Sequence, residues 1–170
     1  PNPGSMIKLL NKGNPVWITK SKNENRKLKY TLQIIQVDKI KICINTHVTN
    51  KIVQEAINKG SIKELKNFNI IRPEKKFGEN TRFDFFLLNK VTNKKAFLEV
   101  KSVSLQRKNH HAEFPDSVTS RGKKHLENLV IANKQGYESY LFFLIQIEKC
   151  KSFAIASDID PEYYKVFNNA

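Results

Sequence analysis

Residues 82–105 read RFDFFLLNKVTNKKAFLEVKSVSL, and this stretch decides what kind of fold the chain can adopt. Two runs rich in β-branched and aromatic residues flank a polar turn, a pattern typical of a β-hairpin. Asp84 opens the first run, and Glu99 and Lys101 interrupt the second. Charged groups inside strands that otherwise suit a core need compensating partners, because an unpaired buried charge is costly. We therefore interpret this hairpin as the carrier of a functional site.

Side chains alternate along a strand, so Glu99 and Lys101 share one face of the second run, and the turn can bring Asp84 opposite them. Two carboxylates beside a backbone carbonyl, here that of Val100, form an oxygen-rich pocket suited to Mg²⁺ or Mn²⁺. A neighbouring lysine can act on a metal-bound water and stabilise negative charge on phosphorus. The set predicts a metal-dependent phosphodiesterase, although an acid-x-Lys pattern is also typical of a solvated sheet face.

Helices with charged residues are predicted on both sides of this hairpin. Apolar residues at helical spacing predict a helix over 48–59, where Glu55 is either a third metal ligand or a surface acid. A polar loop is predicted over 106–118, followed by a helix that starts near Thr119. Its first turns place three residues at i, i+3 and i+4, on one face that can meet phosphates: Arg121, Lys124 and His125. For His125, packing inside the protein is an equal alternative.

Composition bounds the class of protein. The chain of 170 residues carries a formal net charge of +14, which favours a polyanion such as DNA as partner. A lysine-rich bias from AT-rich coding explains part of that charge. No apolar run approaches the roughly 20 residues that span a bilayer, so we expect no membrane partner. Cys43 and Cys150 give no disulfide framework, which fits a reducing cytoplasm. The sequence leaves open whether the protein forms a homodimer.

The first part of the chain differs from the rest. Three strands are predicted over 16–21, 30–37 and 39–45, which suggests a small barrel or part of one. The loop after the first strand could bind along a nucleic-acid backbone, with the Tyr30 ring stacked on a base. Its candidate contacts are Lys20, Lys22, Arg26, Lys27, Lys29 and Tyr30. The alternative is a solvated charged loop without a partner. After residue 46 strands and helices alternate, which favours an α/β core with a mixed sheet.

The spacing D-x(14)-E-x-K resembles the active-site motif of the PD-(D/E)xK nuclease superfamily. The whole chain is also similar to the sugar fermentation stimulation protein A family, and the matching segments keep the order of that family: PNPGSM, RKLKYT, INTHVTNKIVQEAI, TRFDFFL, FLEVKSVSL, FPDSVTSRGKKHLENL and DIDPEYY. This resemblance implies an OB-like β-domain at 1–45 and a PD-(D/E)xK nuclease-like domain at 46–170, with a mixed sheet flanked by helices. By motif position it assigns the nuclease-like site to Asp84, Glu99 and Lys101.

The same resemblance implies DNA binding with little sequence preference and, by the family name, a link to sugar-utilisation genes. It carries Arg121 and Lys124 over as phosphate contacts. The family has more chain before its PN-x-G segment, so we expect the barrel to be partial in residues 1–45, because an OB barrel needs five strands. Our leading hypothesis is a DNA-binding protein with a Mg²⁺- or Mn²⁺-dependent nuclease site. The alternatives are a non-enzymatic DNA-binding regulator and an RNA-binding accessory protein.

Overall fold

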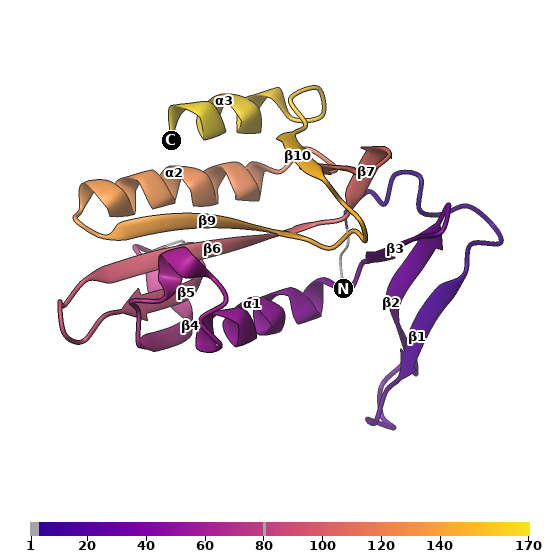
Figure 1. Cartoon of the computed structure of the whole chain (residues 1–170), viewed down its shortest axis with the longest axis horizontal. Coiled ribbons are helices and arrows are strands. Elements are labelled where there is room, and N and C mark those ends of the chain that lie inside the picture. Colours follow the sequence, from indigo (N-terminus) through magenta and orange to yellow (C-terminus); the bar gives the residue numbers. More distant parts are fainter. Residues whose placement is uncertain (1–3, 80) are drawn as a thin grey trace.

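The computed structural model describes residues 4–79 and 81–170, so the first three residues of the PNPGSM segment lie outside the described part. Its body has a central sheet with α1 (Thr49–Asn58) on one face and two helices, α2 (Ser120–Lys134) and α3 (Pro161–Asn169), on the other (Figure 1). In sheet order the strands are β4 (Ile70–Phe77), β5 (Thr81–Leu88), β6 (Lys95–Val103) and β9 (Glu138–Ile145). The pairs β4–β5 and β5–β6 are antiparallel and β6–β9 is parallel, which confirms the predicted mixed sheet.

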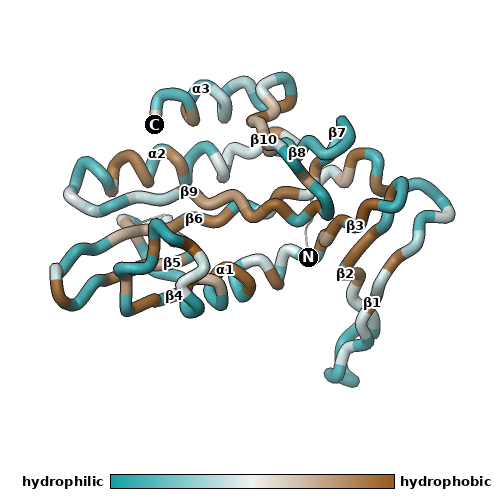
Figure 2. The backbone as a smooth tube through the Cα atoms, in the orientation of Figure 1, coloured by the Kyte–Doolittle hydropathy of each residue, from teal (hydrophilic) through white to brown (hydrophobic). Residues whose placement is uncertain are grey.

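Each face of the sheet has its own apolar cluster. The strands between them, β6 and β9, contain the hydrophobic stretches drawn in brown in Figure 2. On one face Val53 and Ile57, one helical turn apart on α1, pack in a cluster with Leu98. On the other face Leu129 of α2 packs with Phe97. Because residues 97 and 98 point to opposite sides of β6, this strand is buried on both faces and holds the two halves of the core together.

The beginnings of α2 and α3 are fixed by side-chain caps. The Thr119 hydroxyl accepts a hydrogen bond from the Gly122 N–H at 3.0 Å, and a Cβ added at Gly122 would lie only 2.7 Å from that hydroxyl oxygen. A residue with a side chain would therefore push the cap aside. The buried Asp160 carboxylate accepts from the Tyr163 N–H at 2.9 Å and from the Thr119 N–H at 2.8 Å. One carboxylate thus ties both helix starts together.

The N-terminal part forms an antiparallel sheet of β1 (Val16–Lys20), β2 (Tyr30–Val37) and β3 (Ile40–Cys43). The β1–β2 hairpin projects away from the body (Figure 1). A bridge between Ile42 and Ile147 joins this sheet to the segment after β9, and both residues belong to one buried cluster. The predicted boundary at 45/46 falls between β3 and a 3-10 turn, Thr46–Val48.

The prediction of a polar loop over 106–118 is wrong. This segment contains β7 (Leu105–Lys108) and β8 (His111–Phe114), and β10 (Ser152–Ile155) pairs in parallel with β8. Part of its charge is paired within the protein: Arg107 donates to both oxygens of Glu113 at 2.6 and 2.8 Å and also contacts Asp158. No helix within residues 4–79 and 81–170 is long and apolar enough to cross a membrane.

Replacing Leu98 by alanine should destabilise the fold strongly. The Leu98 side chain is 0% exposed, so its removal leaves a cavity under α1 and should lower the free energy of unfolding by about 2–5 kcal/mol. Urea denaturation followed by circular dichroism measures the change. The control is Val91→Ala, because Val91 is 88% exposed in a turn and its truncation should change the free energy of unfolding by less than about 0.5 kcal/mol. Equal effects of the two substitutions would contradict the assigned core.

Arg107 should make the fold sensitive to acid. Its hydrogen bonds lower the pKa of Glu113 from the ordinary 4.5 and lower that of Asp158 to about 2. A carboxyl whose pKa is lower in the folded state stabilises the fold above its unfolded pKa, and this stabilisation is lost as the pH falls. Between about pH 4.5 and 2, the wild type should therefore lose more stability than Arg107→Gln. The control Lys108→Gln, an exposed neighbour, should follow the wild type in urea unfolding across this range.

Candidate metal and phosphate site

The site forms where two neighbouring strands separate. The recorded pairing of β5 with β6 runs from Leu88 only as far as Phe85 opposite Leu98. At the next position the Asp84 side chain takes over the role of the β5 backbone as acceptor. Its Oδ2 accepts a hydrogen bond from the Val100 N–H at 2.8 Å. Phe83 and Phe85 belong to clusters on opposite faces of the sheet, whereas residues two apart in a regular strand share a face. The alternation of side chains between the two faces of the sheet is therefore interrupted at Asp84.

Asp84 lies between α1 and β6. Its Oδ1 accepts from the side-chain amide of Asn50 on α1 at 2.7 Å. Burial raises the pKa of Asp84, the nearby negative charge of Glu99 raises it further, and the hydrogen bonds from Val100 and Asn50 oppose this rise. Asp84 contacts the backbone of Val100, the residue that follows Glu99, so the hairpin places the two acids near each other.

Glu99 is held by two donors on one of its oxygens. Its Oε1 accepts from Lys101 Nζ at 2.7 Å and is also contacted by His125 Nδ1 of α2. Burial tends to raise the pKa of Glu99, but the hydrogen bonds and charges of His125 and Lys101 outweigh it, so the pKa is lowered. Glu99 is only 3% exposed, and its Oε2 is buried without a hydrogen-bond partner in the described part of the chain.

A hard divalent cation fits these donors. A buried carboxylate oxygen without a partner is rare, and here it comes from an ionised acid beside a second carboxylate. Mg²⁺ and Mn²⁺ prefer such oxygen ligands and keep several waters. Within the described ranges, no group of three or more His, Cys, Asp or Glu side chains surrounds one point. Asp84 and Glu99 would therefore share the ion with water, substrate or a backbone carbonyl.

Two hollows lie beside this site, and Glu99 is not among the described residues that line either of them. The first, of about 590 Å³, lies over Asp84 and is called the acidic hollow; its lining includes the acids Glu74 and Asp84, the cations Lys51 and Arg121, and Asn50, Gln54 and Val100. The basic hollow, of about 480 Å³, is lined by Arg82, Ser120, Arg121, Lys124 and His125. Arg121 contributes to both linings, so the two hollows adjoin at this side chain. The predicted phosphate contacts Arg121 and Lys124 thus lie next to the predicted metal ligands.

The structure places Glu55 away from Asp84. Its exposed carboxylate pairs with Lys59 one turn along α1. The helix instead directs Asn50 and Gln54, at i and i+4, toward the acidic hollow. The sequence contained this signal, because these two residues flank the buried Val53 on the inward stripe of α1. Of the two roles left open for Glu55, this geometry supports the surface acid, and the helix supplies amides to the site.

His125 lies deeper than a phosphate contact requires. Only its edge reaches the basic hollow, and its Nδ1 is engaged with Glu99. Arg121 Nε lies 3.5 Å from His125 Nε2 on the opposite side of the ring. Of the two roles that the sequence left open, this geometry supports packing inside the protein, with the imidazole acting as a support for the acid.

The basic loop of the N-terminal sheet is separate from the acid pair. Its predicted nucleic-acid contacts are all exposed, on or next to the connection between β1 and β2: Lys20, Lys22, Arg26, Lys27, Lys29 and Tyr30. Sequence reasoning missed Trp17 on β1, which is 40% exposed and has Lys41 Nζ 5.1 Å from its ring centroid. An exposed ring beside cations is typical of a base-stacking surface. In the sequence, the position of Trp17 just before the basic loop could have indicated this role.

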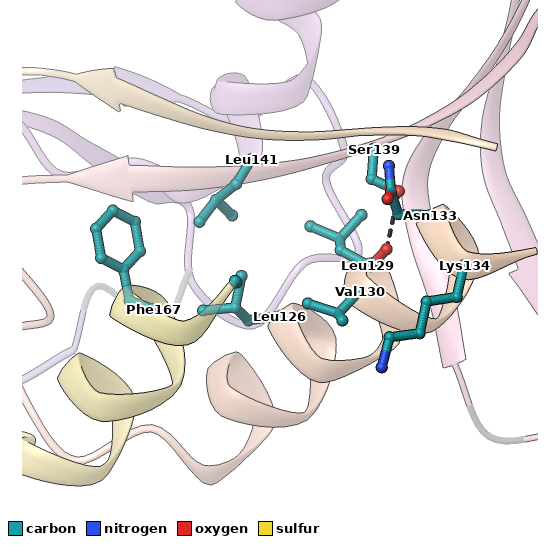
Figure 3. A pocket seen from close by; sticks show the side chains of 9 residues that line it. Leu126, Leu129, Val130, Asn133, Lys134, Ser139, Leu141 and Phe167 are labelled. Carbon is teal, nitrogen blue, oxygen red and sulfur yellow. Dashed lines mark hydrogen bonds between the residues drawn. The ribbon is translucent and has the colours of Figure 1, made fainter. Parts of the chain in front are cut away.

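Another hollow, of about 380 Å³, lies between α2, β9 and α3 (Figure 3). Its walls are mainly apolar, from Leu126, Leu129, Leu141 and Phe167, and the Ser139 hydroxyl closes one side by donating to the Leu129 carbonyl at 2.8 Å. Lys134 is the one charged side chain among its lining residues in the described chain. This composition does not suit phosphate or metal chemistry.

Comparison with known proteins agrees with this architecture. A family model described as "Sugar fermentation stimulation protein RE domain" matches residues 47–170, and one described as "SfsA N-terminal OB domain" matches residues 1–44. The chain belongs to the sugar fermentation stimulation protein family. This confirms the resemblance found in the sequence, together with the expected combination of an OB-type N-terminal part and an α/β domain.

Individual relatives support this assignment. The chain is 49% identical over 165 residues to a sugar fermentation stimulation protein homolog of Pelagibacter ubique, covering 97% of this chain and 70% of the relative. A homolog of Rhodospirillum centenum is 43% identical, with coverages of 95% and 69%. The solved structure of the Pyrococcus furiosus family member, described in complex with Ca²⁺, superposes with a TM-score of 0.87 at 22% identity, covering 98% of this chain and 70% of that one. It shows the same fold.

Replacing His125 should reveal its supporting role. His125→Ala removes one of the two donors to the buried Glu99 and should lower the free energy of unfolding by about 1–3 kcal/mol. His125→Asn carries an amide nitrogen near the position of Nδ1 and should restore part of this loss. Urea unfolding measures both variants, and DNA affinity measured beside it should change less than twofold. A large loss of DNA affinity without a loss of stability would return His125 to the phosphate contacts.

Proposed function

We propose that this protein binds DNA without sequence preference and hydrolyses its phosphodiester bonds with the help of Mg²⁺ or Mn²⁺. The observation that carries the proposal is the buried Glu99 Oε2, a carboxylate oxygen without a partner that lies beside a second acid, Asp84. A divalent cation bound there would lower the pKa of a bound water and offset negative charge on phosphorus. The chain's own residues would position the other reactants.

Each side chain has a role that follows from its place. Asp84 is fixed by Asn50 and the Val100 N–H, so its carboxylate stays at the floor of the acidic hollow. Lys101, with a side chain only 12% exposed, holds its ammonium group on Glu99, where it can orient the attacking water or stabilise charge on the phosphate. A fixed cation in a site of low dielectric acts more strongly than one in water.

The surface around the acids suits a polyanion. Arg121 and Lys124 are exposed on one face of α2 beside the acidic hollow, where they could hold the phosphate backbone of a nucleic-acid strand. The net charge of +14 and the basic hairpin loop add long-range attraction for nucleic acid. The Ca²⁺ in the Pyrococcus furiosus structure belongs to that protein, but Ca²⁺ and Mg²⁺ both take oxygen ligands, which supports a divalent cation here.

One observation favours a non-enzymatic DNA-binding regulator as the second candidate. Glu99 and Lys101 are nearly buried and bonded to each other, whereas the cations around them are exposed. In this alternative the buried pair would only stabilise the platform that binds DNA. A role in sugar-utilisation genes would then follow the family name.

A cleavage assay on plasmid, linear and single-stranded DNA separates the two candidates. Wild type in Mg²⁺ or Mn²⁺ should cut, and addition of EDTA should stop the reaction. Glu99→Gln and Lys101→Met should lower the rate about 100-fold or more while DNA binding stays within a few-fold of wild type. Lys95→Met, which removes an exposed lysine from the same strand, is the matched control and should cut normally. A wild type that binds DNA and cuts in neither metal would establish the regulator.

A further inference from the structure

The basic hollow brings three cationic side chains together: Arg82, Arg121 and Lys124. Arg82 comes from β5, two residues before Asp84, while Arg121 and Lys124 come from the first turns of α2. No carboxylate belongs to the lining of this hollow among residues 4–79 and 81–170. Cations that converge from two separate elements, with space of about 480 Å³ between them, form a site for a phosphate group.

The basic hollow adjoins the acidic hollow through Arg121. Because the hollows adjoin, a nucleic-acid strand whose scissile phosphate lies over Asp84 could place a neighbouring phosphate in the basic hollow. Arginine suits this task because its planar guanidinium can donate two parallel hydrogen bonds to one phosphate. Arg82 is the member of this set that sequence reasoning did not single out.

Arg82 is paired with an acid at the edge of the two hollows. Its Nε lies 2.7 Å from Glu74 Oε2, and both side chains are more than half exposed, at 59% and 56%. Exposed ion pairs of this kind contribute little, so a phosphate with better geometry can take the guanidinium away from Glu74. The pair is a reversible contact at the surface.

The place of Glu74 in its strand is unusual. The neighbouring pairs Pro73–Phe85 and Lys75–Phe83 put Glu74 opposite Asp84 across β4 and β5. Its φ is +57°, in the left-handed region that costs energy for a residue other than glycine. Such strain persists where the surrounding structure imposes it, and it is concentrated at functional sites. Here it occurs in the lining of the acidic hollow, at the residue that holds Arg82.

We propose that Arg82, with Arg121 and Lys124, binds the phosphate next to the scissile one, and that Glu74 competes with this phosphate for the Arg82 guanidinium. The inference rests on the proposed function, since it assumes a nucleic-acid strand over Asp84. It adds a second phosphate site, at which DNA competes with the Glu74 carboxylate for the Arg82 guanidinium. The substrate class is therefore a chain with at least two consecutive phosphates.

The test measures the affinity of the purified protein for a fluorescent 20-base-pair duplex by anisotropy, in EDTA so that no metal contributes. Arg82→Gln should weaken binding about fivefold or more and make the slope of log affinity against log salt shallower by about 0.9, the value for one phosphate contact on duplex DNA. The matched control Arg72→Gln removes an equal charge from an exposed arginine of β4 that lines neither hollow in the described chain, and should weaken binding less than twofold.

The acid is tested in the same assay. Glu74→Gln should tighten binding about twofold to fivefold, because it frees Arg82, and this gain should disappear in the double variant Glu74→Gln/Arg82→Gln. The control Glu64→Gln, an exposed acid of the 3-10 turn Lys63–Leu65, should have less effect. A gain that persists without Arg82 would reflect general charge and would overturn the competition between Glu74 and phosphate.

Failure of this inference can be told from failure of the proposed function. If wild type binds DNA and Arg82→Gln behaves as Arg72→Gln, the second phosphate site is overturned while the nuclease proposal stands. If wild type binds no DNA even at low salt, both fall. Thermal melting checks that each variant is folded. Should Arg82→Gln unfold, Arg82→Lys retains the charge without the bidentate geometry, and its affinity should still fall at least twofold; unchanged affinity would count against the site.

Discussion

The hydrogen bond from the Val100 N–H to Asp84 is the contact on which the rest of the site depends. Where β5 leaves β6, the amide of Val100 would otherwise lose its partner in a strand that is buried on both faces. A buried N–H without an acceptor destabilises a fold, so an acid at this point serves the sheet as well as the chemistry. The separation of two strands, rather than a loop, creates the acidic hollow, and the core on either side keeps it rigid.

The second acid shows how the same core supports unequal carboxylates. Lys101 and His125 both engage one oxygen of Glu99, which keeps this acid ionised in a buried place and leaves its other oxygen free. Asp84 has a donor on each oxygen, and its pKa moves in the opposite direction. Their neighbours thus shift the pKa values of the two acids in opposite directions. Shifted pKa values of this kind cluster at functional sites.

Much of this arrangement could be predicted from local sequence patterns. The hairpin, the shared face of Glu99 and Lys101 and the helix that carries Arg121 all follow from periodicities of two and 3.6 residues, and the fold assigned from them is confirmed. The change of facing at Asp84 could not be predicted, because it arises from the competition between β6 and the Asp84 side chain. The partner of His125 depends on how α2 packs across the sheet, which a single sequence does not encode locally.

Two segments illustrate the same limit. The stretch around Arg107 has the composition of a solvated loop, yet its charges pair across β7 and β8 and with a residue far along the chain. For Glu55 the sequence left open a metal ligand or a surface acid, and its exposed pair with Lys59 supports the surface acid, while the amides of Asn50 and Gln54 lie on the side of α1 that faces the site. In both cases the tertiary partner, which composition does not reveal, decided the role of the polar residue.

The cap that Asp160 provides to both helices affects the order in which the chain can fold during synthesis. Thr119 precedes the helix that carries the exposed cations, yet the carboxylate that fixes its N–H comes from a residue 41 positions later. During synthesis the cation-bearing helix therefore lacks this anchor until the residues up to Asp160 have emerged. The surface that carries Arg121 and Lys124 would reach its final geometry only after this later segment has folded.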